Sequence, residues 1–119
     1  MRSKNLGKKG EERAVEALEA AGMSIIARNT RSKHGEIDIV ALDKETIVFV
    51  EVKTWSVYGI EELQYSLDFR KQRRIIETAK YFLSVHREYN KMAIRFDVVF
   101  IKEDSVIHLA SAFSELYDG

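Results

Sequence analysis

The segment Thr46–Lys53 reads Thr-Ile-Val-Phe-Val-Glu-Val-Lys and predicts a strand that is buried on both faces. Its β-branched and aromatic residues run almost without interruption, which is typical of the central strand of a covered sheet. Because side chains alternate along a strand, Glu51 and Lys53 are expected next to each other on one face. Charges at the end of a central strand are costly to desolvate, so they are tolerated mainly where they pair, bind a metal or open into a cleft. This end of the strand is therefore the first place to look for a functional site.

A second acidic side chain is expected on the strand that precedes the central one. The segment Glu36–Leu42 reads Glu-Ile-Asp-Ile-Val-Ala-Leu, and the short turn Asp43–Glu45 joins it to the central strand as a hairpin. Alternation places Asp38 on the face opposite Ile37 and Ile39. Asp38 is therefore a carboxylate inside an apolar strand, and that strand pairs with the one that carries the first acidic residue.

A third carboxylate, Glu11, belongs to a helix predicted from about Asn5 to Ala21, with Gly22 as its C-terminal stop. At about 100° per residue, Glu11 falls in the middle of the apolar stripe that includes Ala14 and Leu18. It either faces the sheet as part of a site or is a first-turn acid favoured by the helix dipole. The helical pattern alone leaves both interpretations open.

Apolar periodicity predicts the remaining elements. Strands are expected at Met23–Ala27, Ala93–Ile101 and Ser105–Leu109, a helix from near Leu67 to Val85, and a closing helical turn around Phe113 and Leu116. The order is helix, three strands, helix, two strands, which predicts an α/β fold with one mixed sheet flanked by helices. The length predicts a single domain over residues 1–119.

Basic side chains gather at the start of the second helix and in a loop expected after the first strand. Helical periodicity places Gln72 inside the apolar stripe of the second helix and Lys71 on its edge, so both face the sheet. Such clusters are usually a solvated surface, but beside carboxylates they would also form a track for phosphates. The candidates for nucleic-acid contact are Arg31, Lys33, Arg70, Lys71, Gln72 and Arg74.

The composition limits where the protein works. Lys and Arg number 19 and Asp and Glu number 19, so net charge by itself favours no class of partner. There is no cysteine, which excludes disulfides, thiolate metal sites and a cysteine nucleophile. No apolar run is long enough for a membrane span, and no signal peptide is recognisable. We expect a cytoplasmic protein with no membrane partner.

The candidate catalytic side chains of the sequence are Glu11, Asp38, Glu51 and Lys53. Carboxylate ligands suit a hard cation such as Mg²⁺, which binds through one or two carboxylates plus water and substrate phosphate. A cation on Asp38 and Glu51, with Glu11 nearby, could activate water against a phosphodiester, and Lys53 could orient that water. The alternative for these charges is a structural ion pair. No role is expected for Glu36, His86 and His108.

Five segments in order carry a family resemblance: Gly10-Glu11 with Ala14, Gly35-Glu36-Ile37-Asp38, Val48 to Lys53, Lys71-Gln72, and Arg95-Phe96-Asp97-Val98-Val99. Over most of its length the chain resembles the YraN-like family of uncharacterised bacterial proteins. That family is similar to the restriction-endonuclease-like superfamily and to archaeal Holliday junction resolvases. The resemblance implies an α-β-β-β-α-β nuclease core that uses Mg²⁺ or Mn²⁺. It also implies metal-binding acids at Glu11, Asp38 and Glu51 and a catalytic lysine at Lys53.

Three functions follow as hypotheses. The first is a Mg²⁺- or Mn²⁺-dependent endonuclease acting on DNA, including branched or damaged DNA, as a homodimer if both strands are cut symmetrically. The second is a nucleic-acid-binding module of the same fold that works with a partner protein. The third is a structural domain in which Glu51 and Lys53 merely pair with each other.

Overall fold

The computed structural model describes residues 2–54 and 68–115, with the side chains of residues 9–54 and 68–115. The elements are α1 (Arg2–Ala20), β1 (Ser24–Ser32), β2 (Gly35–Asp43), β3 (Thr46–Thr54), α3 (Phe69–Val85), a short 3₁₀ turn (Arg87–Tyr89), β4 (Ala93–Ile101) and β5 (Val106–Phe113). Among the described residues, no helix is both long and apolar enough to cross a membrane.

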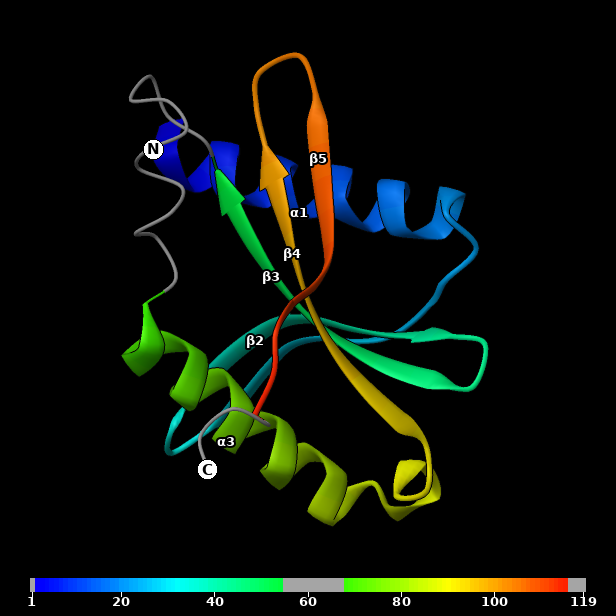
Figure 1. Cartoon of the computed structure of the whole chain (residues 1–119). Coiled ribbons are helices and arrows are strands. Elements are labelled where there is room, and N and C mark those ends of the chain that lie inside the picture. Colours follow the sequence, from blue (N-terminus) through cyan, green and yellow to red (C-terminus); the bar gives the residue numbers. More distant parts are fainter. Residues whose placement is uncertain (1, 55–67, 116–119) are drawn as a thin grey trace.

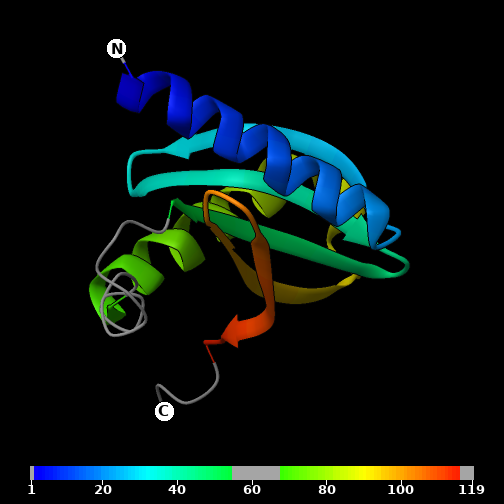
Figure 2. The same cartoon turned by 90° about the horizontal axis from the view of Figure 1, so that it is seen from above.

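The strands form one mixed sheet in the order β1-β2-β3-β4-β5 (Figure 1). Neighbouring strands are antiparallel except β3 and β4, which run parallel. A parallel pair needs a crossover connection, and α3 lies in that connection. The sheet lies between α1 on one face and α3 on the other (Figure 2). The α/β prediction is confirmed, and the element order is consistent with a restriction-endonuclease-like core.

Each helix packs on one face of the sheet and forms an apolar core with it. The core on the α1 side contains Ala14, Leu18, Met23, Ile39, Ala41, Val48, Val50, Val99 and Ile101. The core on the α3 side contains Ile37, Val40, Ile47, Phe49, Ile75, Ile76, Ala79, Phe82 and Phe96. In the second core the ring centroid of Phe49 lies 5.9 Å from that of Phe82 and 5.7 Å from that of Phe96. The strand β3 is thus buried on both faces, as its sequence predicts.

The strand β2 loses its alternation at Asp38. Ile39 packs on the α1 side, whereas Ile37 packs on the α3 side, so the prediction that these two residues share a face is wrong. The ladder with β3 begins only at Ile39, while the ladder with β1 continues past this point. Opposite Asp38, Asn29 of β1 has a φ of 53°, a left-handed conformation that disturbs regular strand geometry. The strand β2 therefore twists away from β3 at Asp38.

Two boundaries differ from the sequence predictions because strand pairing extends polar segments. The strand β1 continues to Ser32, so Arg31, which was predicted in a loop, lies on an edge strand. The strand β5 continues to Phe113, and the helical turn predicted there is wrong. Strand formation depends on the neighbouring strand more than on local propensity, so the pattern misses both extensions. The predicted helix start near Leu67 and the tail turn at Leu116 lie outside the described residues.

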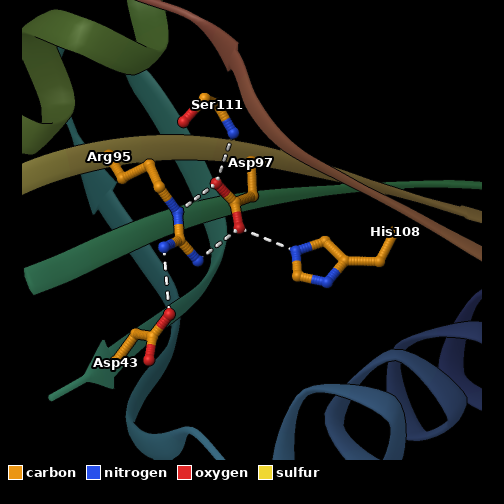
Figure 3. A network of polar contacts seen from close by, with 5 residues as sticks. All are labelled: Asp43, Arg95, Asp97, His108 and Ser111. Atoms are coloured by element: carbon orange, nitrogen blue, oxygen red, sulfur yellow. Dashed lines mark hydrogen bonds and ion pairs between the residues drawn. The ribbon is translucent and has the colours of Figure 1, made fainter. Parts of the chain in front are cut away.

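A fully buried carboxylate, Asp97, ties β4 to its neighbours (Figure 3). It accepts hydrogen bonds from Arg95 Nε and Nη2 at 2.9 and 3.0 Å and from the Ser111 backbone N–H at 3.0 Å. The Nε2 atom of His108 lies 2.7 Å from it, and Arg95 also donates to Asp43 at 2.9 Å. Burial by itself raises the pKa of Asp97, but these donors hold it below its usual value. His108, for which no role is expected from the sequence, is thus part of a structural network.

We predict that Asp97→Ala lowers the free energy of unfolding by about 3–5 kcal/mol, because it leaves Arg95 and the Ser111 N–H without their buried acceptor. Urea unfolding followed by circular dichroism measures this change. The matched control is Asp104→Ala in the exposed β4–β5 turn, which should cost no more than about 0.5 kcal/mol. Equal effects of the two substitutions would contradict a structural role for the network.

Candidate functional site

The site forms where β2 and β3 separate. Their ladder ends at the pair Ile39 and Val50, one residue before Asp38 and Glu51 would meet. Beyond that pair, Asp38 Oδ2 accepts a hydrogen bond from the backbone N–H of Val52 at 2.7 Å. The side-chain carboxylate thus bonds to β3 beyond the end of the regular ladder, and a cavity of about 180 Å³ opens beside it. The cavity is lined by Gly35, Glu36, Asp38, Glu51, Lys71, Arg74 and Ile75.

Glu51 is the charge at the centre of this cavity. It lies on β3, and its side chain is only 8 % exposed. Lys71, in the first turn of α3, places Nζ 2.9 Å from Glu51 Oε2, and Lys53 places Nζ 3.5 Å from the same oxygen. The predicted proximity of Glu51 and Lys53 is confirmed. The contact with Lys71 joins α3 to the end of the central strand.

The pKa of Asp38 lies well above its usual value. Burial and the neighbouring charge of Glu51 raise the pKa of Asp38 to about 7, although the hydrogen bond from Val52 acts to lower it. Near neutral pH, Asp38 is therefore divided between its neutral and ionised forms. Two carboxylates that resist being charged together are typical of a site that takes up a cation or a proton.

The two lysines that contact Glu51 differ in how firmly they hold their protons. Burial lowers the pKa of Lys53, and the contact with Lys71 lowers it further, against the attraction of Glu51. Burial acts in the same direction on Lys71, but its contacts with Lys53 and Glu51 raise the pKa of Lys71 above the usual value. Lys71 is therefore the firmly charged ammonium, and Lys53 is the amine that more readily gives up a proton.

Glu11 is not brought into the cavity. Its Oε1 lies 3.5 Å from Nη2 of Arg28 on β1, and it is absent from the lining residues. Its charge still contributes, as the smallest cause, to the raised pKa of Asp38. Across residues 2–54 and 68–115, no three acidic or histidine side chains form a group able to hold a metal ion. The structure thus brings together Asp38, Glu51 and Lys53 and leaves the third predicted acid apart.

The β1–β2 hairpin packs against α3 (Figure 1), and its residues Gly35 and Glu36 line one side of the cavity. Gly35 has a φ of +157°, and a Cβ at this position would lie 3.4 Å from the Cβ of Arg74. Only glycine adopts this backbone conformation without strain. Ser32 Oγ and Thr78 Oγ1, 2.9 Å apart, add a hydrogen bond between the hairpin and the helix.

The predicted nucleic-acid contacts differ in their placement. Lys71 and Arg74 line the cavity, while Arg70 on α3 and Lys33 at the tip of the hairpin are exposed and do not line it. Arg31 is paired with Glu36, with Nε 2.9 Å from Oε2. Gln72 is half-buried and does not line the cavity.

Sequence reasoning missed two features of the site. Glu36 was expected to have no role, yet it lines the cavity, and its position two residues before Asp38 could have indicated this. The ion pair between Lys71 and Glu51 joins distant segments, so no local pattern signals it. A larger apolar cavity of about 630 Å³ between α3 and the β4–β5 strands contains none of the predicted site residues.

Comparisons with known proteins agree with one another. Residues 10–101 match the model of a family described as "Uncharacterised protein family UPF0102". A UPF0102 protein of Treponema denticola is 41 % identical, covering 96 % of this chain and 98 % of its own. One from Treponema pallidum (strain Nichols) is 46 % identical with 96 % of each chain covered, and one from Persephonella marina is 42 % identical with 90 % and 91 % covered. These names state no activity.

We predict that Asp38→Asn stabilises the metal-free protein more at alkaline than at acidic pH. The folded pKa of about 7 exceeds the unfolded value near 3.9, so the folded state holds an extra proton between these limits and loses stability as the pH rises through this window. The gain from Asp38→Asn should be larger at about pH 8 than at about pH 5, by on the order of 2 kcal/mol.

Urea unfolding at both pH values, with a chelator present, checks this difference. Asp104→Asn, in an exposed turn, is the matched control and should give the same small change at each pH. A gain from Asp38→Asn that does not depend on pH would contradict the raised pKa.

Proposed function

This chain belongs to the uncharacterised protein family UPF0102, and we propose that it is a metal-dependent endonuclease that hydrolyses phosphodiester bonds of nucleic acid, in particular DNA. The observation that carries the proposal is the meeting of Asp38 and Glu51 in one cavity, with Nζ of Lys53 lying 3.5 Å from Glu51 Oε2. Two carboxylates and an amine beside a cationic rim suit a polyanionic substrate that must be attacked by water.

The residues present fit a Mg²⁺ or Mn²⁺ ion. Asp38 and Glu51 supply hard oxygen ligands, and a cavity of about 180 Å³ has room for several water molecules beside them. Relief of the repulsion between the two carboxylates would favour cation binding, because that repulsion raises the pKa of Asp38. When bound, the cation would polarise the phosphate and lower the pKa of a water molecule.

Side chains of this protein would carry out the proton transfer and hold the phosphate. Lys53, whose pKa burial lowers, can orient the attacking water and accept its proton as the water oxygen bonds to phosphorus. The bond from phosphorus to the leaving sugar oxygen breaks in the same displacement. Arg74, at the edge of the cavity, can hold a phosphate oxygen through its planar guanidinium.

The surroundings favour a nucleic acid over a small phosphodiester. Lys71 and Arg74 of α3 line the cavity, and Arg70 on α3 and Lys33 at the hairpin tip add exposed positive charge on the two elements that contribute to its lining. A chain of phosphates can contact several such groups at once and gains affinity by releasing its counterions. DNA is the polymer that we propose to test first.

A nucleic-acid-binding module that works with a partner protein is the second candidate. The observation that favours it is the ion-pairing of Glu51, whose Oε2 already contacts the ammonium groups of Lys71 and Lys53. A carboxylate satisfied in this way needs no metal. The basic rim would then bind phosphates without chemistry at the cavity.

We predict that Glu51→Gln lowers the rate of DNA cleavage by about 100- to 1,000-fold, because it removes one charge from the proposed metal site. Labelled junction, flap, single-stranded and duplex DNA, incubated with Mg²⁺ or Mn²⁺, are the substrates. The control Glu45→Gln changes an exposed turn residue at the opposite end of β3 and should cleave like wild type. Absence of cleavage on every substrate, or cleavage unaffected by Glu51→Gln, would count against the endonuclease.

A thermal-shift experiment separates the two candidates. For an endonuclease, Mg²⁺ at a hundredfold excess over its Kd stabilises wild type by about 2.7 kcal/mol, and Asp38→Asn abolishes most of that gain. For a binding module, neither protein responds to Mg²⁺ beyond an equal ionic strength of NaCl. DNA affinity that falls steeply with salt but is independent of divalent ions and of Asp38 would establish the second candidate.

A further inference from the structure

Lys71 occupies the position that a cation would take on Glu51. Its Nζ lies 2.9 Å from Glu51 Oε2, closer than Nζ of Lys53 at 3.5 Å. The two ammonium groups thus share one carboxylate oxygen on a side chain that is only 8 % exposed. A divalent cation that reached Glu51 would meet the positive charge of Lys71 at short range and repel it.

Lys71 is the ammonium that can leave. Its side chain is 37 % exposed, against 22 % for Lys53, and it belongs to the first turn of α3 rather than to the central strand. A lysine head group on a flexible stem can turn outward into water without moving the helix. Lys53 is held closer to the sheet by its place on β3.

A phosphate that entered this cavity would meet Lys71, which lines it. Arg74, one turn further along α3, lines the same cavity and is exposed. A divalent cation adds two positive charges, and an incoming phosphate supplies a new partner for the displaced ammonium.

We propose that Lys71 is a placeholder cation, which neutralises Glu51 while the metal is absent and moves to the substrate phosphate when the metal binds. The exchange couples the two ligands: metal binding releases Lys71 for the phosphate, and phosphate binding removes the ammonium that opposes the metal. By linkage, each ligand raises the affinity for the other by the same factor. This inference rests on the metal site of the proposed function and adds to it a positioning residue with a regulatory effect.

The test measures metal affinity rather than activity. Isothermal titration of Mn²⁺ compares wild type with Lys71→Met, which keeps the apolar stem and removes the charge. The variant should bind Mn²⁺ on the order of 10-fold more tightly, within the range of typical coupling free energies. Lys71→Arg, which keeps the charge, should bind like wild type. Lys80→Met, on α3 but paired with Glu77 and Glu115 away from the cavity, is the matched control and should leave Mn²⁺ affinity unchanged.

The second measurement is the coupling itself. Mn²⁺ titrations are repeated with a saturating phosphorothioate oligonucleotide that resists hydrolysis. In wild type the oligonucleotide should tighten Mn²⁺ binding several-fold, and in Lys71→Met this effect should disappear. A variant with equal or weaker Mn²⁺ affinity, or one that keeps the full coupling, would overturn the proposal and make Lys71 a structural partner of Glu51.

The outcomes distinguish this inference from the endonuclease. If Lys71→Met tightens Mn²⁺ binding and abolishes the coupling while no DNA is cleaved, the placeholder stands and the endonuclease fails. If Glu51→Gln abolishes cleavage while Lys71→Met leaves Mn²⁺ affinity unchanged, the endonuclease stands and the placeholder fails. If wild type binds no Mn²⁺, both fail together.

Discussion

A carboxylate inside the central strand of a covered sheet constrains everything around it. Burying the Glu51 carboxylate is costly unless cations reach it, and the two that do come from different elements, Lys53 from the same strand and Lys71 from α3. The ion pair between Lys71 and Glu51 therefore holds the first turn of α3 beside the end of β3. Because β2 twists away at Asp38, the space beside the paired charges stays open as a cavity instead of being filled by a neighbouring strand.

Two aspartates of the same sheet, the buried Asp97 and the half-buried Asp38, illustrate how surroundings decide between structure and site. Asp97 receives donors from Arg95, Ser111 and His108, and these donors hold its pKa low, so it is a satisfied structural anion. Asp38 has a backbone donor but faces the charge of Glu51, and its pKa rises to about 7. The carboxylate of Asp97 is satisfied by these donors and requires no further ligand. The arrangement around Asp38 is relieved by a proton or a cation, which is why it is the better candidate for chemistry.

Family membership leaves the function to be argued from the site, because a fold hosts many activities and the printed names of the relatives state none. The cavity holds the two carboxylates proposed for catalysis, and residues of the hairpin and of α3 line it. Gly35 supplies the backbone conformation of the hairpin beside Arg74, and residues of both elements line the same cavity. A polyanion that meets this surface would be drawn to the charged pair beneath it.

The amino-acid sequence by itself determined both helices, the central strand and the shared face of Glu51 and Lys53, because these features follow from short-range periods of 3.6 and two residues. It also indicated Asp38 as a site residue, but it did not predict the loss of regular alternation in β2 at that position. Only the tertiary structure decided that Lys71 reaches Glu51, that Glu11 pairs with Arg28 instead of entering the cavity, and that polar β1 continues as an edge strand. The first two contacts join segments far apart in the chain, and the third depends on how a polar segment pairs with its neighbouring strand, so no local pattern records them.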